Sequence, residues 1–252
     1  MKLTYDDDLK QIDFYKTHPE YLPFIGDNFD EFRILQVGES HYIGQSSAYA
    51  PFDLEYFDKW WTDSCPELYE HPDGYPETKC WGSWYKTRDV IGRFLNKNQN
   101  NYSIFTNMIR AFDEAVGGLP ECVNIKRKYH YFAFMNFFQM PSLHQGVSFE
   151  KSIYKSAKEA DNPTAVYKRA VEESCAVLDK VVGILNPNAI VFTSKAAYRA
   201  YCTHRGECAE IDKRLINTVH PGCSWWNRPI KRFDGRTGRE ELVRALRNHL
   251  NE

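Results

Sequence analysis

The chain has 252 residues, of which 42% are hydrophobic and 26% are charged, a composition typical of a globular protein. The formal net charge is only −2, but the charges are unevenly placed. Residues 1–120 carry 11 basic and 20 acidic side chains, whereas residues 121–252 carry 21 and 14. This asymmetry is a weak indication of a polyanion partner, and two solvated faces of opposite charge explain it equally well.

The sequence favours a cytoplasmic protein without bound metal or cofactor. No apolar run approaches the roughly 18 residues of a membrane span, and the acidic opening is unlike a secretory signal. The seven cysteines are odd in number and scattered, which favours free thiols in a reducing compartment. Cys202, His204 and Cys208 are metal-capable residues, but their spacing fits no common zinc site.

Short apolar runs alternate with helical patterns, which predicts βαβ units. In chain order we expect a strand at 33–37, an aromatic-rich insertion at about 44–84, a helix at 85–95, a strand at 131–137, a helix at 164–185, a strand at 189–193, a helix at 195–201, a strand at 215–219 and a helix at 239–250. The fold class predicted for residues 1–252 is a single α/β domain. Its three layers, α/β/α, enclose a central, mostly parallel four-stranded sheet.

Each predicted strand ends on a small or polar motif. Gly38-Glu39 follows the first strand, Asn136 lies at the end of the second, Ser194 bounds the third and His220 follows the fourth. In an open α/β sheet, ligands bind outside the carboxyl ends of the strands. The four motifs therefore predict one shared crevice.

The motifs and their order resemble the uracil-DNA glycosylase superfamily. The matching segments are Gly38-Glu39-Ser40-His41-Tyr42, a strand ending in Asn136, the segment from Pro187 to Ala197, and His220-Pro221-Gly222. Each motif is short, but four in this order are moderately specific, and the resemblance spans roughly residues 30–250. It implies a glycosylase that hydrolyses the N-glycosidic bond of uracil or another damaged base flipped out of DNA.

The resemblance also implies roles for individual residues. Asn136 would read the base edge with its amide, His220 would stabilise the departing anion, and Glu39 would orient water or offset charge on the sugar. The residues expected to shape the substrate pocket are Gly38, Ser40, His41, Tyr42, Phe137 and Ser194. The residues expected to contact DNA are Pro221, Gly222, Ser224, Trp225, Trp226, Arg228, Lys231 and Arg232. No lysine is placed for a Schiff base, so no lyase step is expected.

The first motif departs from the family pattern in three places. Ser40 stands where the family has Asp or Asn, and His41 replaces a Pro. Glu39 is similar to the iron–sulfur branch of the family, but the cysteine ligands of that branch are not recognisable here. We therefore expect no iron–sulfur cluster.

Two other functions remain open. A non-catalytic protein that binds nucleic acid or nucleotides is compatible with the same fold, and the loss of the usual Asp or Asn at Ser40 favours it. Gly-Glu-Ser-His also resembles the start of the erythromycin-esterase-like hydrolases, in which Glu39 and His41 would act as an acid/base pair. Each residue also has a purely structural interpretation: Glu39 as a helix cap, Asn136 as a backbone-bonding side chain and His220 as a buried histidine.

Overall fold

The computed structural model describes residues 1–42, 60–61, 86–96, 102–119, 125–142, 144, 146–158 and 161–250. Its centre is a five-stranded sheet in the order β1-β3-β2-β4-β5. The strands are β1 (Phe24–Ile25), β2 (Ile34–Gly38), β3 (Phe132–Asn136), β4 (Ala189–Phe192) and β5 (Leu215–Asn217). The predicted α/β class is therefore confirmed, and the four predicted strands are present close to their expected positions.

The sheet contains one strand more than the sequence predicted. Strand β2 pairs in parallel with β3 on one side and with β4 on the other, and β4 pairs in parallel with β5. Strand β1 pairs antiparallel with β3. The fifth strand is only two residues long, too short for an alternating pattern to reveal it. Strand β5 is also shorter than expected, because regular pairing stops at Asn217.

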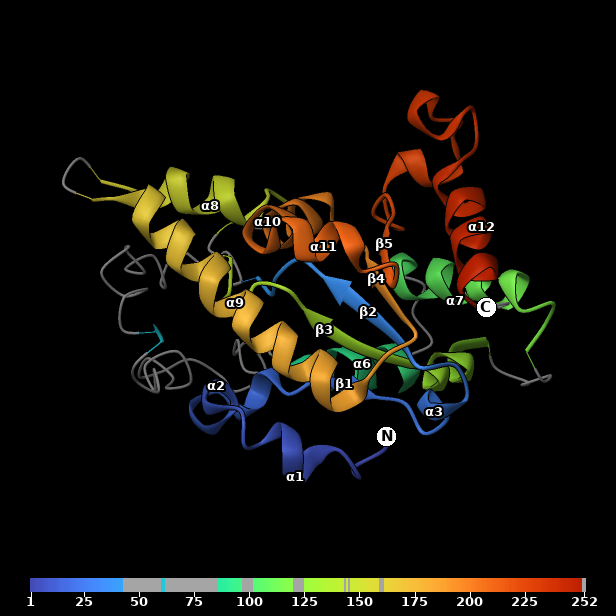
Figure 1. Cartoon of the computed structure of the whole chain (residues 1–252), viewed down its shortest axis with the longest axis horizontal. Coiled ribbons are helices and arrows are strands. Elements are labelled where there is room, and N and C mark those ends of the chain that lie inside the picture. The colour runs from blue at the N-terminus through green and yellow to red at the C-terminus, as the bar shows by residue number, and fades with distance from the viewer. Residues whose placement is uncertain are drawn as a thin grey trace.

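Helices precede, connect and follow the strands (Figure 1). Those before β2 are α1 (Asp6–Leu9), α2 (Asp13–Thr17), the 3-10 turn η1 (Pro19–Tyr21) and α3 (Phe29–Phe32). Those between β2 and β4 are α6 (Thr87–Asn96), α7 (Ser103–Ala115), η5 (Ile125–Tyr131), α8 (Phe149–Ser156) and α9 (Pro163–Leu185). Those after β4 are α10 (Lys195–Arg205), α11 (Glu207–Ile211), η6 (Ser224–Asn227), η7 (Lys231–Phe233) and α12 (Gly238–Leu250).

The long helix α9 shows how the sequence sets helix ends. Asn162 caps its N-terminus by accepting a hydrogen bond from the Ala165 amide at 3.1 Å, and Pro163 occupies the first turn, where its missing N–H costs nothing. Asn186 ends the helix with a left-handed backbone, at φ 42°. The predicted helix stop at this position is confirmed.

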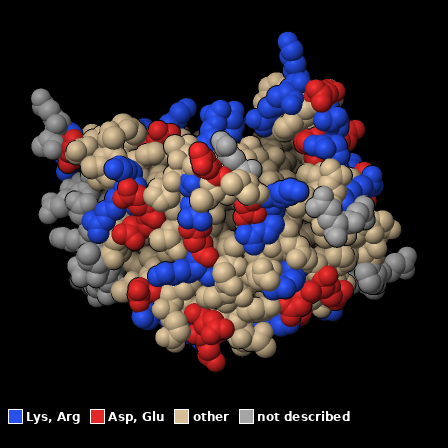
Figure 2. Space-filling model, in the orientation of Figure 1, with Lys and Arg blue, Asp and Glu red and all other residues tan. Residues whose placement is uncertain are grey.

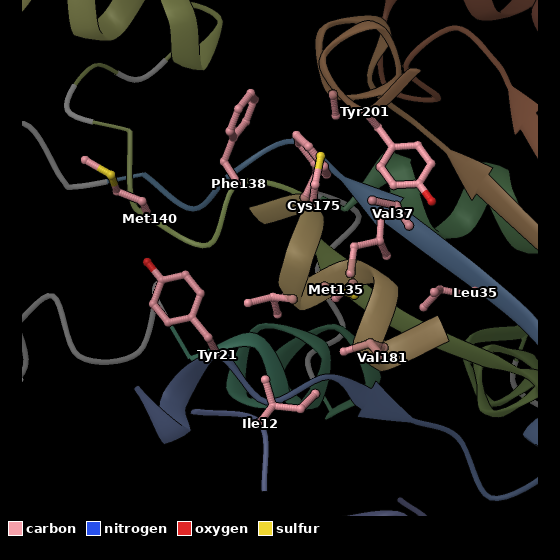
Figure 3. Packing of buried hydrophobic residues seen from close by; sticks show 14 of the residues in the cluster. Ile12, Tyr21, Leu35, Val37, Met135, Phe138, Met140, Cys175, Val181 and Tyr201 are labelled. Carbon is pink, nitrogen blue, oxygen red and sulfur yellow. The ribbon is translucent and has the colours of Figure 1, made fainter. Parts of the chain in front are cut away.

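Helices pack on both faces of the sheet, over two hydrophobic clusters. Leu35 and Val37 of β2 point to one face, where α1, α2, α8, α9 and α10 contribute to the packing (Figure 3). Ile34 points to the other face, because side chains alternate along a strand. Helices α6, α7, η5 and α12 cover that face. Strands buried on both faces read as continuous apolar runs, which is why the sequence revealed them.

Helix α7 was not predicted, although its sequence carries a helical signal. Phe105, Met108, Ile109 and Phe112 recur at the spacing of one helix face and are all buried. Of the 44–84 insertion, only Trp60 and Trp61 are described, so the remainder of that prediction lies outside the described residues. Among the described helices, none is long and apolar enough to cross a lipid bilayer.

Candidate active site at the carboxyl edge of the sheet

The connectivity of the sheet places a topological switch point between the ends of β2 and β4. The chain passes from β2 to β3 on one side, then returns past β2 to β4 on the other. Connections that diverge from adjacent strands leave an opening at the carboxyl ends, where ligands bind in open α/β sheets. Glu39 follows β2 and Ser194 follows β4, so both lie at this switch point.

The Glu39 carboxylate joins two helix N-termini across the switch point. Its Oε2 accepts a hydrogen bond from Ser194 Oγ at 2.7 Å, and its Oε1 accepts one from the Phe149 amide, also at 2.7 Å. Ser194 caps α10, and Phe149 is the first residue of α8. A carboxylate is favourable there because helix N-termini carry partial positive charge and unpaired N–H groups. The structural interpretation of Glu39 as a helix cap is confirmed.

Gly38 makes room for the side chain of Asn136. The two residues are partners in the β2–β3 register. A Cβ atom on residue 38 would lie 2.2 Å from Asn136 Oδ1, far closer than atoms can approach. Asn136 is only 7% exposed, and its side-chain amide has no hydrogen-bond partner within the described part of the chain. Among the described residues, this nearly buried amide is therefore without a protein partner.

Gln139 fixes the turn that follows Asn136. Its side-chain Nε2 donates to the Asn136 carbonyl, and its backbone N–H donates to Ser174 Oγ at 3.1 Å. The Gln139 carbonyl in turn accepts from Trp60 Nε1 at 2.8 Å. Trp60 is fully buried and stacks on His18, with ring centroids 4.2 Å apart. The Asn136 backbone is therefore held by a hydrogen-bonded network that reaches the insertion.

His220 lies on a loop that is attached to α7. The Asn107 amide of α7 donates to the Pro221 carbonyl at 2.7 Å, and Cys223 N–H donates to the His220 carbonyl at 2.9 Å. Gly222 N–H donates to His220 Nδ1 at 3.0 Å, so Nδ1 carries the lone pair and the proton of the neutral ring is on Nε2.

The surroundings of His220 favour the neutral ring. Although the side chain is accessible to solvent, the protein atoms around it remove part of its hydration and lower its pKa. The negative charge of Glu39 acts in the opposite direction and raises that pKa, so the two groups are electrostatically coupled. Of the four residues predicted to converge at this edge, Glu39 and Ser194 are hydrogen-bonded and Asn136 pairs with Gly38 in the sheet, whereas the link of His220 to Glu39 is the effect of that charge on its pKa.

Two more residues of the first motif remain at the site. Tyr42 is 37% exposed, and its pKa is raised by burial and by the charge of Glu39. Ser40 is 8% exposed, and its buried Oγ has no hydrogen-bond partner among the residues that the structure describes. Two polar side chains without a partner among the described residues therefore lie close to Glu39. Ser40 is its neighbour in the chain, and Asn136 pairs with the adjacent Gly38 in the sheet.

Three predicted site residues have other positions. His41 is buried, with Nε2 3.0 Å from Thr87 Oγ1 of α6, and its ring packs edge-on against Tyr21. Phe137 is fully buried and packs against core rings, because the residue after Asn136 points to the opposite face. Trp226 is 2% exposed in the core under α12, so it is not available to contact DNA.

The other residues predicted to contact DNA lie in the connection between β5 and α12, part of which projects from the molecule in Figure 1. The Trp225 side chain is 56% exposed. Residues that are also exposed on this segment are Gly222, Ser224, Arg228, Lys231 and Arg232. Pro221 is buried against α7. Figure 2 shows Lys and Arg atoms over much of the projecting segment, together with acidic atoms.

Sequence reasoning missed the residues that support the site. Asn107 holds the His220 loop, and Phe149 contributes only its backbone N–H, which no motif reveals. A cavity of about 500 Å³ between α7, η6 and α12 includes Asn107, and two of its charged side chains, Arg239 and Glu114, pair with one another. Within the described ranges, no group of three or more His, Cys, Asp or Glu side chains is placed to hold a metal ion.

Comparisons with protein-family models, with curated proteins and with solved structures give no match for this chain. Its function is therefore inferred from the chemistry of the site.

Proposed function

We propose that the protein is a DNA glycosylase, a hydrolase that cleaves the N-glycosidic bond of a damaged base flipped out of DNA, and that its fold is that of the uracil-DNA glycosylases. The observation that carries the proposal is the Asn136 amide. It is nearly buried, has no hydrogen-bond partner within the described residues, and lies beside Glu39 at the switch point of the sheet. An amide offers both a donor and an acceptor, which is what the edge of a pyrimidine requires.

His220 has the properties of an anion stabiliser. Its Nδ1 accepts from Gly222 N–H, which leaves the Nε2 proton free to donate. Cleavage of the glycosidic bond leaves negative charge on the departing base, and a donor positioned where that charge develops lowers the barrier. A neutral ring is suited to this role, because it donates without having to be protonated first, and the desolvation of the ring by neighbouring protein atoms lowers the pKa of His220.

Glu39 supports the reaction by its position and charge. Its two oxygens each accept one hydrogen bond, from Ser194 and from Phe149, while a carboxylate has about four acceptor positions in total. One free lone pair orients the attacking water in this proposal, and the negative charge offsets the positive charge that develops on the sugar. Tyr42 is close enough to Glu39 for that charge to raise the pKa of its hydroxyl, in addition to the larger effect of burial.

The projecting segment supports a DNA partner. An exposed Trp next to exposed Arg228, Lys231 and Arg232 combines an aromatic wedge with cations for phosphates. A glycosylase that flips a base must hold the strand on both sides and fill the space that the base leaves.

The esterase alternative is less well supported by the geometry. It requires Glu39 and His41 to act as a pair, but His41 is buried against Thr87 and Tyr21. A non-catalytic nucleic-acid-binding protein has one observation in its favour: both Glu39 oxygens are already used in holding helices. The excision experiment separates this alternative from the glycosylase.

We would incubate the purified protein with labelled oligonucleotides that contain uracil, hypoxanthine, xanthine or a mismatched base, in single- and double-stranded form. The expected product is an intact strand with an abasic site. His220→Ala and Asn136→Asp are expected to lower the excision rate by 10² to 10⁴-fold, as expected for loss of a group that acts in the transition state.

His249→Ala is the matched control, since it removes an imidazole from the last turn of α12, remote from the site. It should retain the wild-type rate. Binding of these oligonucleotides without excision of any base by folded protein would contradict the glycosylase and favour the binding protein.

A further inference from the structure

Two helices beside the candidate site carry cations that have no partner among the described residues. Lys151 and Lys155 are four residues apart on α8, and Lys195 and Arg199 are four residues apart on α10. Residues at this spacing share one face of a helix, and all four side chains are exposed. Within the part of the chain that the structure describes, no carboxylate pairs with any of these charged groups. We call these four residues the helix-cation face.

The cations are placed where they oppose helix stability. Like charges at a spacing of four residues repel one another on a helix. Lys195 is the first residue of α10 and Lys151 the third of α8, in the turns where the helix dipole favours negative charge. Glu150 is the neighbour of Lys151, but consecutive residues do not face one another on a helix. A bound polyanion would offset this repulsion.

The helix-cation face borders the candidate site. The Glu39 carboxylate bonds to Phe149 at the start of α8 and to Ser194, which directly precedes Lys195. Figure 1 places α8 and α10 along the upper edge of the molecule, across from the projecting segment around η7. Figure 2 shows Lys and Arg atoms along that edge as well as on the projecting segment, with some acidic atoms between them.

We propose that the helix-cation face binds the phosphates of DNA on the side of the site opposite the projecting segment. The backbone would then be held on both sides of the flipped nucleotide. This inference depends on the proposed function for the identity of the polyanion. It adds a second contact surface, which no motif in the sequence predicted.

The test measures binding to undamaged DNA, so that it does not depend on excision. Two double variants, Lys195→Gln with Arg199→Gln and Lys151→Gln with Lys155→Gln, remove one half of the face each. The affinity for a fluorescent duplex is measured by anisotropy over a range of NaCl concentrations. Because each phosphate contact contributes about 0.9 to the slope of log K against log [salt], each double variant should reduce that slope by about 1.8.

The matched control is Lys168→Gln with Lys180→Gln. Both lysines are exposed on α9, which covers a face of the sheet, and the net charge changes equally. This control should retain the wild-type slope, and no variant should have a thermal midpoint markedly below that of the wild type.

Equal slopes for the control and the two face variants would overturn the proposal, since net charge would then explain binding. Wild-type excision with slopes unchanged in both face variants would overturn it while leaving the glycosylase intact. Absence of both DNA binding and excision by the wild type would overturn both proposals.

Discussion

Replacing Gly38 by alanine tests whether the site depends on the Asn136 amide. The new Cβ would lie 2.2 Å from Asn136 Oδ1, whereas ordinary contacts are 3.4–4 Å, so the amide has to move by about 1 Å or more. A misplacement of about 1 Å costs roughly 10²-fold in rate. Overpacking lowers the free energy of unfolding by about 1–3 kcal/mol. Alanine also reduces the backbone entropy of the unfolded chain, which raises the free energy of unfolding by about 0.4–1 kcal/mol. We expect a net loss of roughly 0–2.6 kcal/mol in the free energy of unfolding.

Urea unfolding and excision rates are measured for Gly38→Ala in the wild-type and in the Asn136→Ala background. If the clash is with the amide, the stability cost should disappear when the amide is absent, apart from the 3.3 Å contact with Phe134 Cζ. Gly183→Ala in α9 is the control, because its new Cβ has open space, and it should stabilise by about 0.5–1 kcal/mol. An equal cost of Gly38→Ala in both backgrounds would refute the reasoning.

Three further predictions concern charge, capping and the two tryptophans. In an NMR titration, the pKa of the His220 ring should lie below its usual 6.5 and fall further in Glu39→Gln, because the Glu39 charge supports the protonated ring; a rise in the variant would contradict the coupling. Urea unfolding of Ser194→Ala should show a loss of about 1–2 kcal/mol, because the cap on α10 is removed; no loss would mean that the cap is redundant. Trp225→Ala should change the free energy of unfolding by less than about 0.5 kcal/mol but weaken DNA binding, because Trp225 is exposed. Trp226→Ala should lower the free energy of unfolding by about 3–5 kcal/mol, because Trp226 is buried. Equal effects of the two variants on stability would contradict this difference in burial.

The pH dependence of the His220 contribution follows from the sign of its shift. The pKa in the folded protein is lowered, so the ring is neutral in the fold at a pH where the unfolded chain still binds a proton. Its contribution to stability is complete above about 6.5 and is lost as the pH falls through the folded pKa. The acidic limb of the excision profile should lie in the same range.

Strands and strand ends were the part of the fold that the sequence predicted well. Buried parallel strands are apolar on both faces, so β2 and β4 stand out against their polar surroundings. The convergence of Glu39 with Ser194 followed from strand order, since the carboxyl ends of parallel strands meet at one edge.

The orientation of individual side chains was not predictable in the same way. Phe137 is adjacent to Asn136 but points into the core, and His41 is two residues from Glu39 but faces α6. These directions depend on strand alternation and on long-range partners such as Thr87, which lies 46 residues away. A motif records spacing along the chain and therefore does not distinguish a site residue from its buried neighbour.

The structural and catalytic interpretations of Glu39 are compatible with one another. A carboxylate that accepts from Ser194 Oγ and from Phe149 N–H has a fixed position, and fixed charge is what stabilises a transition state without reorganisation. The same bonds hold α8 and α10 together at the switch point, so Glu39 connects the helix-cation face to His220. Glu39→Gln retains the size of the side chain and removes its charge. If Glu39 acts only by holding the two helices, this variant should be less stable but leave the pKa of His220 unchanged. Because the charge of Glu39 raises the pKa of His220, we expect both the stability and that pKa to fall.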